Sequence, residues 1–183
     1  MNKVALMSID YQKGFDHTIW GQRNNPNAEF NMALLLSHWR KSGMPVIHVQ
    51  HCSIEPNSPL RTGFSGNDFK QETKPLEGEA IFKKSVNSAF IGTNLQAYLE
   101  DNNIQSLVIA GLTTDHCVST TTRMAGNYGF NVTLVSDATA TFDRTGEDGV
   151  HYTADQIHNI HLASLNGEFC TVKTTDEVLR MTE

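Results

Sequence analysis

The sequence lacks any hydrophobic run long enough to cross a membrane and any cluster of basic residues. Its 183 residues include 14 Lys and Arg against 20 Asp and Glu, which gives a formal net charge of −6. This balance argues against the basic surface with which proteins bind nucleic acids or anionic membranes. No stretch approaches the roughly 18 consecutive apolar residues of a membrane span. We therefore expect neither nucleic acid nor membrane among the partners.

Cysteine is also scarce, and nothing near the N-terminus indicates a secretion signal. Cys52, Cys117 and Cys170 are odd in number and far apart, so free thiols in a reducing compartment are expected. The first apolar run, residues 4–9, stops at Asp10 and is not followed by a small-residue cleavage site. These features predict a cytoplasmic protein. Since no linker or repeat interrupts the chain, we expect a single domain over residues 1–183.

Short apolar runs alternate with segments of helical periodicity along the whole chain. The apolar runs predict buried strands, and the periodic segments predict helices. The expected strands are residues 4–9, 45–50, 79–84, 105–111, 131–138 and 168–173, and the expected helices are residues 31–43, 93–103, 115–128, 153–167 and 175–181. This alternation is typical of the α/β class, here a three-layer α/β/α sandwich with a mostly parallel, six-stranded, Rossmann-like sheet. Residues 52–78 are expected to form a long loop.

Chemically active side chains stand at or just after three of the predicted strands. In open α/β sheets, ligands bind beyond the carboxyl ends of the strands, so Asp10, Cys117 and a lysine from residues 83–84 are expected at one edge. Side chains alternate along a strand, so only one of the two lysines can join the other groups. Each residue has a structural alternative: Asp10 could cap the following turn, the lysine could be a surface residue, and Cys117 could be a small buried hydrophobe.

Cys117 is placed at the start of a predicted helix, where a thiolate is favoured. A helix N-terminus and a nearby ammonium both stabilise the anion and lower the pKa of a cysteine. The unpaired N–H groups of the same turn can hold a developing oxyanion. Asp10 could accept the thiol proton and return it to a leaving amine. For Cys52 and Cys170, packing is the expected role.

The segments "ALMSIDYQKGF", "KKSVNSAFIGTNLQAYL" and "VIAGLTTDHCVSTTTRMAGNYGFNVTLVSDATATFD" occur in this order. Together they resemble the isochorismatase-like cysteine hydrolases, a family that includes nicotinamidases, N-carbamoylsarcosine amidases and isochorismatases. The family's Lys-x-x-x-Ser-Ala-Phe segment selects Lys84, four residues before Ser88. The resemblance implies that Asp10 accepts the Cys117 thiol proton while Lys84 stabilises the thiolate. It also implies hydrolysis of a C–N bond in a small amide, carbamoyl compound or lactam through a thioester.

The resemblance carries further implications for the backbone and the substrate contacts. It implies an oxyanion hole made by the backbone N–H groups of Thr113 and Cys117, and a cis peptide bond between Leu112 and Thr113. It also places the ring of Phe15 against the substrate. Further candidate substrate contacts are Trp20, Phe90 and His116. Core packing is the alternative for the aromatic residues, and a local cap is the alternative for His116.

The sequence departs from the family's metal motif. Family nicotinamidases bind a metal through Asp-x-His and later histidines, but "HVQHCSIEPNSPLRTGF" offers only His48 and His51. Such a site would lack its carboxylate, so no metal and no cofactor is expected. The spacing of His151, His158 and His161 would permit metal binding, yet no carboxylate or cysteine completes a set.

Two other functions stay open, an isochorismatase-type ether hydrolase and a non-catalytic ligand-binding or thiol-redox protein on the same fold. Isochorismatases lack the cysteine, so Cys117 argues against the first. An exposed thiol of low pKa would suit the second. Family analogy also predicts a homo-oligomer, a dimer or tetramer, in which residues 139–153 form an arm that reaches a second copy.

Overall fold

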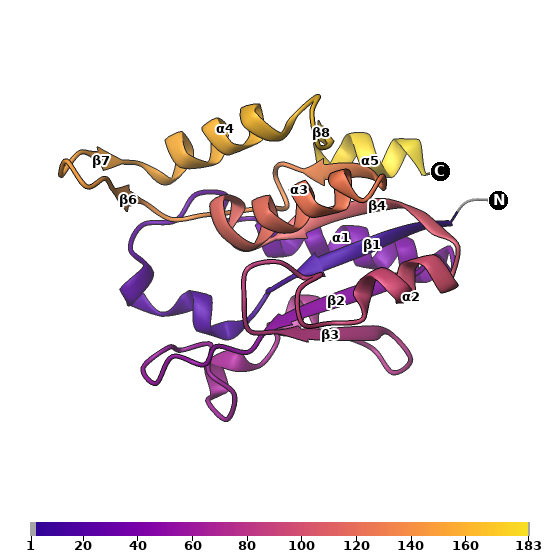
Figure 1. The fold of residues 1–183 in the computed structure, drawn as a ribbon, viewed down its shortest axis with the longest axis horizontal. Coiled ribbons are helices and arrows are strands. Elements are labelled where there is room, and N and C mark those ends of the chain that lie inside the picture. Colours follow the sequence, from indigo (N-terminus) through magenta and orange to yellow (C-terminus); the bar gives the residue numbers. More distant parts are fainter. Residues whose placement is uncertain (1–2, 183) are drawn as a thin grey trace.

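Six parallel strands form the central sheet, in the order β3-β2-β1-β4-β5-β8 (Figure 1). The computed structural model describes residues 3–182. The strands are β1 (Lys3–Ile9), β2 (Val46–His51), β3 (Ala80–Lys84), β4 (Ile104–Gly111), β5 (Asn131–Val135) and β8 (Thr171–Lys173). All neighbouring pairs run parallel. The carboxyl ends of the strands therefore share one edge, on the left of Figure 1.

Helices cover both faces of the sheet, which confirms the predicted three-layer arrangement. The helices α1 (Ala28–Lys41) and α5 (Thr175–Met181) pack on one face, and α2 (Leu95–Asp101), α3 (Ser119–Asn127) and α4 (Ala154–Leu165) lie on the other. The central strand β1 alternates between two cores, since Met7 and Ile9 pack toward α2 and α3 whereas Leu6 packs toward α1. Burial on both faces explains why this strand is apolar throughout.

Most element boundaries differ from the sequence prediction by one to three residues, and three of the differences have a clear structural cause. Strand β5 ends at Val135 instead of residue 138, because the chain leaves the sheet in a turn before Ala140 pairs in parallel with Leu112, just beyond β4. Strand β8 begins only at Thr171, since Phe169 and Cys170 donate backbone hydrogen bonds to Leu165 at the end of α4. The helix expected from residue 115 opens with a π-helical turn, Thr114–Val118, before α3.

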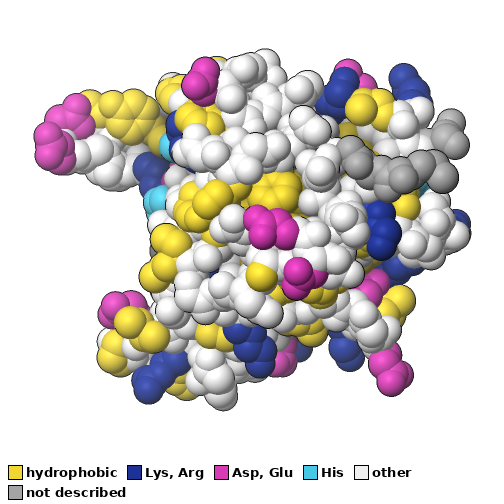
Figure 2. All heavy atoms as spheres, turned by 45° about the vertical axis from the view of Figure 1, so that its right-hand side comes forward, with side chains coloured by type: hydrophobic (Ala, Val, Ile, Leu, Met, Phe, Trp, Pro, Cys, Tyr) yellow, Lys and Arg dark blue, Asp and Glu magenta, His cyan; other side chains and the backbone are white. Residues whose placement is uncertain are grey.

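Long segments gather at the carboxyl edge of the sheet. Residues 10–27 contain two short 3-10 helices, Lys13–Asp16 and Thr18–Trp20, and the predicted loop after β2 contains two more, Ser65–Asn67 and Gln71–Thr73. Strands β6 (Arg144–Thr145) and β7 (His151–Tyr152) form a hairpin that projects from the body, with acidic side chains at its tip (Figure 2). Within residues 3–182, no helix is both long and apolar enough to span a membrane.

Candidate functional site

The Lys84 ammonium lies among three acceptor side chains at the carboxyl edge. Its Nζ is 2.6 Å from Asp10 Oδ2, 3.1 Å from Cys117 Sγ and 3.1 Å from His51 Nδ1. The side chains of Lys84 and Asp10 are fully buried. The strand order brings these side chains together, because β1 lies between β2 and β4, and β3 adjoins β2. The structure thus brings Asp10, Lys84 and Cys117 together, whereas the neighbouring Lys83 is exposed.

Asp10 directs its carboxylate to Lys84 and not to the following turn. Its φ of 55° lies in the left-handed region, which a residue other than glycine adopts rarely and mostly at functional sites. The turn is closed by the backbone instead, since Gln12 N–H donates to the Asp10 carbonyl. The second carboxylate oxygen, Oδ1, is buried and accepts no hydrogen bond from the described residues 3–182. An uncommitted buried oxygen of this kind is suited to receiving a proton.

Cys117 is a buried thiol in the resting site. Burial raises its pKa well above the ordinary value, the nearby Asp10 carboxylate raises it further, and the Lys84 ammonium offsets only part of this. The sequence-based expectation of a lowered thiol pKa is therefore wrong. Burial also disfavours a charged Lys84, but Asp10 and the Cys117 sulfur outweigh it and hold the Lys84 pKa above its usual value. The resting site is an Asp10–Lys84 ion pair beside a neutral thiol.

Close backbone packing places the turn that carries Cys117. A Cβ on Gly111, at the end of β4, would collide with the Ile9 carbonyl, so only glycine allows this approach to β1. The peptide bond between Leu112 and Thr113 is cis, as the resemblance implied. The N–H groups of His116 and Val118 both donate to the Thr113 carbonyl, at 3.2 Å.

The predicted aromatic contacts fall into two groups. The rings of Phe15, Trp20 and Phe142 form one cluster, with centroids 5.3 to 6.2 Å apart. Trp20 is held there because its Nε1 donates to the Gly14 carbonyl at 2.8 Å. Phe15 is buried within the core that faces α1. Through these contacts the three rings pack the segment that follows Asp10 onto the core that faces α1.

Phe90 and His116 lie elsewhere. The ring of Phe90 packs on Tyr128 and Phe130, with centroids 5.3 and 6.2 Å away. Those rings follow the carboxyl end of α3, roughly 15 Å along the helix from Cys117 at about 1.5 Å per residue. Phe90 thus packs in the core, the alternative that the sequence left open for this ring. The side chain of His116 is 57% exposed and its Nε2 is 3.5 Å from Asp115 Oδ2.

Two residues at the site were not assigned to it from the sequence. His51, considered only as a metal ligand, contacts Lys84. Asn87 is exposed and its Oδ1 is 3.8 Å from Cys117 Sγ. Asn87 belongs to the segment that carries Lys84, and His51 ends the strand beside it. From the sequence, only their position near the carboxyl ends of β2 and β3 could have indicated that they belong to the site.

The donor atoms of Asp10, His51 and Cys117 lie within 4.8 Å of one another, a spacing that a metal ion could use. The Lys84 ammonium, however, hydrogen-bonds to all three. A divalent cation there would lie against a buried positive charge, so we assign these acceptors to Lys84. His48 does not add a further ligand atom to these three, because its Nε2 contacts Glu79 Oε2 at 2.8 Å.

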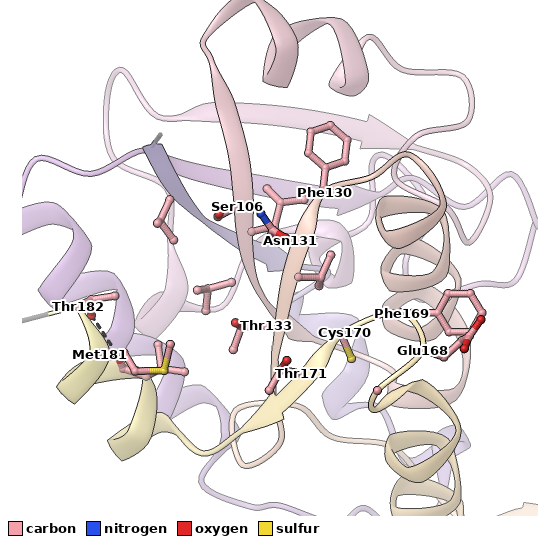
Figure 3. A pocket seen from close by; sticks show the side chains of 16 residues that line it. Ser106, Phe130, Asn131, Thr133, Glu168, Phe169, Cys170, Thr171, Met181 and Thr182 are labelled. Atoms are coloured by element: carbon pink, nitrogen blue, oxygen red, sulfur yellow. Dashed lines mark hydrogen bonds between the residues drawn. The ribbon is translucent and has the colours of Figure 1, made fainter. Parts of the chain in front are cut away.

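A separate groove opens at the opposite edge of the sheet (Figure 3). It has a volume of about 460 Å³ and runs between the amino ends of β4 and β5, strand β8 and helix α5. Val4 lines it, and Asp10 lies roughly 20 Å further along β1 at about 3.3 Å per residue. Cys170 borders the groove, and burial raises the pKa of its thiol to about 11. This cysteine is inert packing, as the sequence predicts.

Comparison with known proteins identifies the family. The isochorismatase domain model matches residues 4–177. The chain is 49% identical to YrdC, an uncharacterised isochorismatase family protein of Bacillus subtilis strain 168, over 177 residues that cover 97% of this chain and 95% of YrdC. A solved isochorismatase-family structure from Chromobacterium violaceum ATCC 12472 matches with a TM-score of 0.96 at 45% identity, covering 100% of this chain and 94% of the other. Nicotinamidase 3 of Arabidopsis thaliana is 25% identical over 190 residues, 97% of this chain and 87% of its own. The chain therefore belongs to the isochorismatase family of hydrolases.

Proposed function

We propose that this protein is a cysteine hydrolase that cleaves a C–N bond of a small amide, carbamoyl compound or lactam. The observation that carries the proposal is the buried contact of Lys84 with both Asp10 and Cys117, at 2.6 and 3.1 Å. An acid, an ammonium and a thiol in contact are the groups that covalent amide hydrolysis requires. The similarity to a nicotinamidase supports the choice of a C–N bond.

The first half of the reaction forms a thioester. Asp10 takes the proton from the Cys117 thiol, and the sulfur electron pair forms a bond to the substrate carbonyl carbon. The carbonyl electrons move to oxygen, where the backbone N–H groups of Thr113 and Cys117 hold the oxyanion. The oxyanion collapses, the C–N bond breaks, and Asp10 gives its proton to the leaving nitrogen. Lys84 neutralises the sulfur anion before the bond to carbon is complete.

The second half hydrolyses the thioester. Asp10 takes a proton from water as the water oxygen bonds to the thioester carbon. The C–S bond then breaks, an acid is released, and the proton on Asp10 returns to sulfur. The site regains its neutral thiol and its Asp10–Lys84 ion pair. Asp10 serves first as base and then as acid in each half, which suits a carboxylate whose Oδ1 is uncommitted within residues 3–182.

The resting thiol argues against the redox alternative. Oxidation requires an accessible thiolate of low pKa, whereas Cys117 is only 7% exposed and its thiol pKa is raised by burial and by Asp10. Ether hydrolysis has no use for the sulfur. It would leave the contact of Cys117 with Lys84 without a purpose.

The test combines turnover with thiol labelling. Release of ammonia, or of a new carboxylate detected by mass spectrometry, is measured over a panel of amides, ureides and lactams. Cys117→Ala should lower the rate at least about 1000-fold, as the loss of a nucleophile does elsewhere. Cys52→Ala, which removes a half-buried thiol outside the site, is the matched control and should keep its rate. Full activity in Cys117→Ala would falsify the proposal.

Asp10→Asn distinguishes the effect of the Asp10 charge on the site from a general structural defect. Because the Asp10 charge raises the thiol pKa, its removal should speed alkylation of Cys117 by iodoacetamide at pH 7 while turnover is lost. A general loosening of the fold would expose the buried Cys170 as well, so faster alkylation of Cys117 with Cys170 still unreactive separates the two explanations. Alkylation slower than in the wild type would contradict the assigned charge arrangement.

A further inference from the structure

We propose that His51 is a positioning residue whose neutral imidazole accepts the third hydrogen of the Lys84 ammonium and holds it between Asp10 and Cys117. The inference rests on the proposed function and deepens it, because it adds a residue to the machinery that sets the thiol. Nothing in the arrangement requires His51 to touch the substrate.

The buried Lys84 ammonium needs an acceptor for each of its hydrogens. A lysine ammonium has three N–H donors and no acceptor, and each buried donor without a partner costs stability. The Lys84 side chain is fully buried. Its donors find Asp10 Oδ2, Cys117 Sγ and His51 Nδ1 at 2.6, 3.1 and 3.1 Å. His51 therefore provides the acceptor for the third N–H of the Lys84 ammonium.

The position of His51 is fixed by its own backbone. Its N–H donates to Gln12 Oε1 at 2.8 Å, and its carbonyl accepts from Gln12 Nε2 at 3.0 Å and from Asn67 Nδ2 at 2.8 Å. His51 is also the register partner of Lys84 between β2 and β3. These contacts hold the ring beside the ammonium without help from a ligand.

The tautomer of the ring follows from its two partners. The Val86 backbone raises the pKa of the ring, as an acceptor beside a ring N–H does. Nδ1 faces Lys84, which can only donate, so Nδ1 carries the lone pair and the proton is on Nε2. A neutral ring in this tautomer is the acceptor that the ammonium needs.

The charges around the ring keep it neutral. Burial lowers the His51 pKa below its ordinary value of 6.5, the Lys84 ammonium lowers it further, and Asp10 opposes them in part. Cys117 contributes a neutral thiol. Protonation would remove the acceptor at Nδ1 and place two positive charges side by side. Activity that depends on this contact should therefore be present above the His51 pKa and be lost as the pH falls through it, below 6.5.

The test compares His51→Asn with His51→Leu. The Oδ1 of asparagine can take the place of Nδ1 and does not titrate, whereas leucine fills the space and accepts nothing. We expect His51→Leu to lower kcat at least about tenfold with KM changed less than about threefold, since a misplaced ammonium affects the reacting sulfur more than binding. His51→Asn should keep most of kcat, and the acid limb of its kcat/KM profile should move to lower pH than in the wild type.

A second readout needs no substrate. The rate of Cys117 alkylation by iodoacetamide at pH 8 should fall about threefold or more in His51→Leu, because a loosened ammonium stabilises the thiolate less, and should stay near the wild type in His51→Asn. This readout stands even if no amide on the panel is turned over. Equal behaviour of both variants would overturn the proposal. If His51→Leu does not fold, an acid limb that stays at the wild-type pH in His51→Asn overturns it alone.

Discussion

At the scale of single residues, the site stores its charge in an ion pair and leaves its nucleophile neutral. The Asp10–Lys84 pair is fully buried, which a protein tolerates only where each charge is matched and hydrogen-bonded. The same burial holds the pKa of Cys117 high. In the proposed mechanism the thiolate therefore forms only when Asp10 takes the proton, a step that an incoming carbonyl can drive. This mechanism ties activation of the proposed nucleophile to the arrival of substrate.

Asn87 gives a prediction at this scale. Its exposed amide, with Oδ1 3.8 Å from Cys117 Sγ, is placed to hydrogen-bond a group next to the scissile carbonyl. Asn87→Ala should lower kcat/KM about tenfold, the size of one lost hydrogen bond, while alkylation of Cys117 stays unchanged. Gln96→Ala, at a half-buried polar residue on α2 whose amide contacts Glu100, is the control. An unchanged kcat/KM in Asn87→Ala would remove this residue from the substrate site.

At the scale of elements, the site is assembled by the carboxyl ends of adjacent strands. Strand β1 delivers Asp10, β2 delivers His51, β3 delivers Lys84, and the turn after β4 delivers Cys117. The turn comes close enough because Gly111 lies against the Ile9 carbonyl. Hydrogen bonds between Ala140 and the turn brace it from the far side, through Gly111 and Thr114. The positions of the catalytic groups thus follow from strand pairing.

Gly111→Ala is the test of that packing. The added methyl group would force β1 and β4 apart, so we expect a loss of about 2 kcal/mol or more in the free energy of unfolding, measured with urea. Gly149→Ala is the matched control, since its φ of 78° is unfavourable for alanine but nothing lies within 4 Å of the new atom. That control should lose only about 1 kcal/mol. A loss in Gly111→Ala no larger than that of the control would show that the contact between Gly111 and the Ile9 carbonyl tolerates the added methyl group.

At the scale of the whole molecule, ion pairs fasten the long segments of the carboxyl edge to the body. Lys70, in the loop after β2, contacts both Asp16 and Glu29, and Arg23 joins Glu29 from the segment after β1. Burial disfavours the Glu29 carboxylate, but Arg23 and Lys70 outweigh this and lower its pKa to about 2. The pairs hold the two segments and α1 together on one side of the site. The β6–β7 hairpin lies outside this framework (Figure 2).

The hairpin carries a prediction about assembly. Val150, 46% exposed on this projecting arm, is an apolar side chain that contact with a second copy would cover. If the protein is a dimer or tetramer through this arm, Val150→Asp should shift its mass in light scattering toward the monomer. Met181→Asp, at an exposed apolar site on α5, is the control and should leave the mass unchanged. An oligomer that survives Val150→Asp would exclude the arm as its interface.

The sequence by itself determined the fold class and three of the groups at the site. Apolar runs and helical periodicity are local patterns, so the six strands and the layers around them could be predicted from them. Asp10 and Lys84 were found because strand ends and the Lys-x-x-x-Ser-Ala-Phe segment are local too. The end of β5 at Val135 was missed because the turn after it is held by pairing with β4, far away in the chain.

Only the tertiary structure decided the protonation of the site and the partners of its side chains. The pKa of Cys117 depends on burial and on Asp10, which is distant in sequence, and no local pattern reports either quantity. His51 could be interpreted only as a metal ligand until its Nδ1 was seen to face Lys84. Phe90 belongs to a motif, yet rings beyond α3 place it in the core. Burial and distances between strands arise only when the chain has folded, and they set this chemistry.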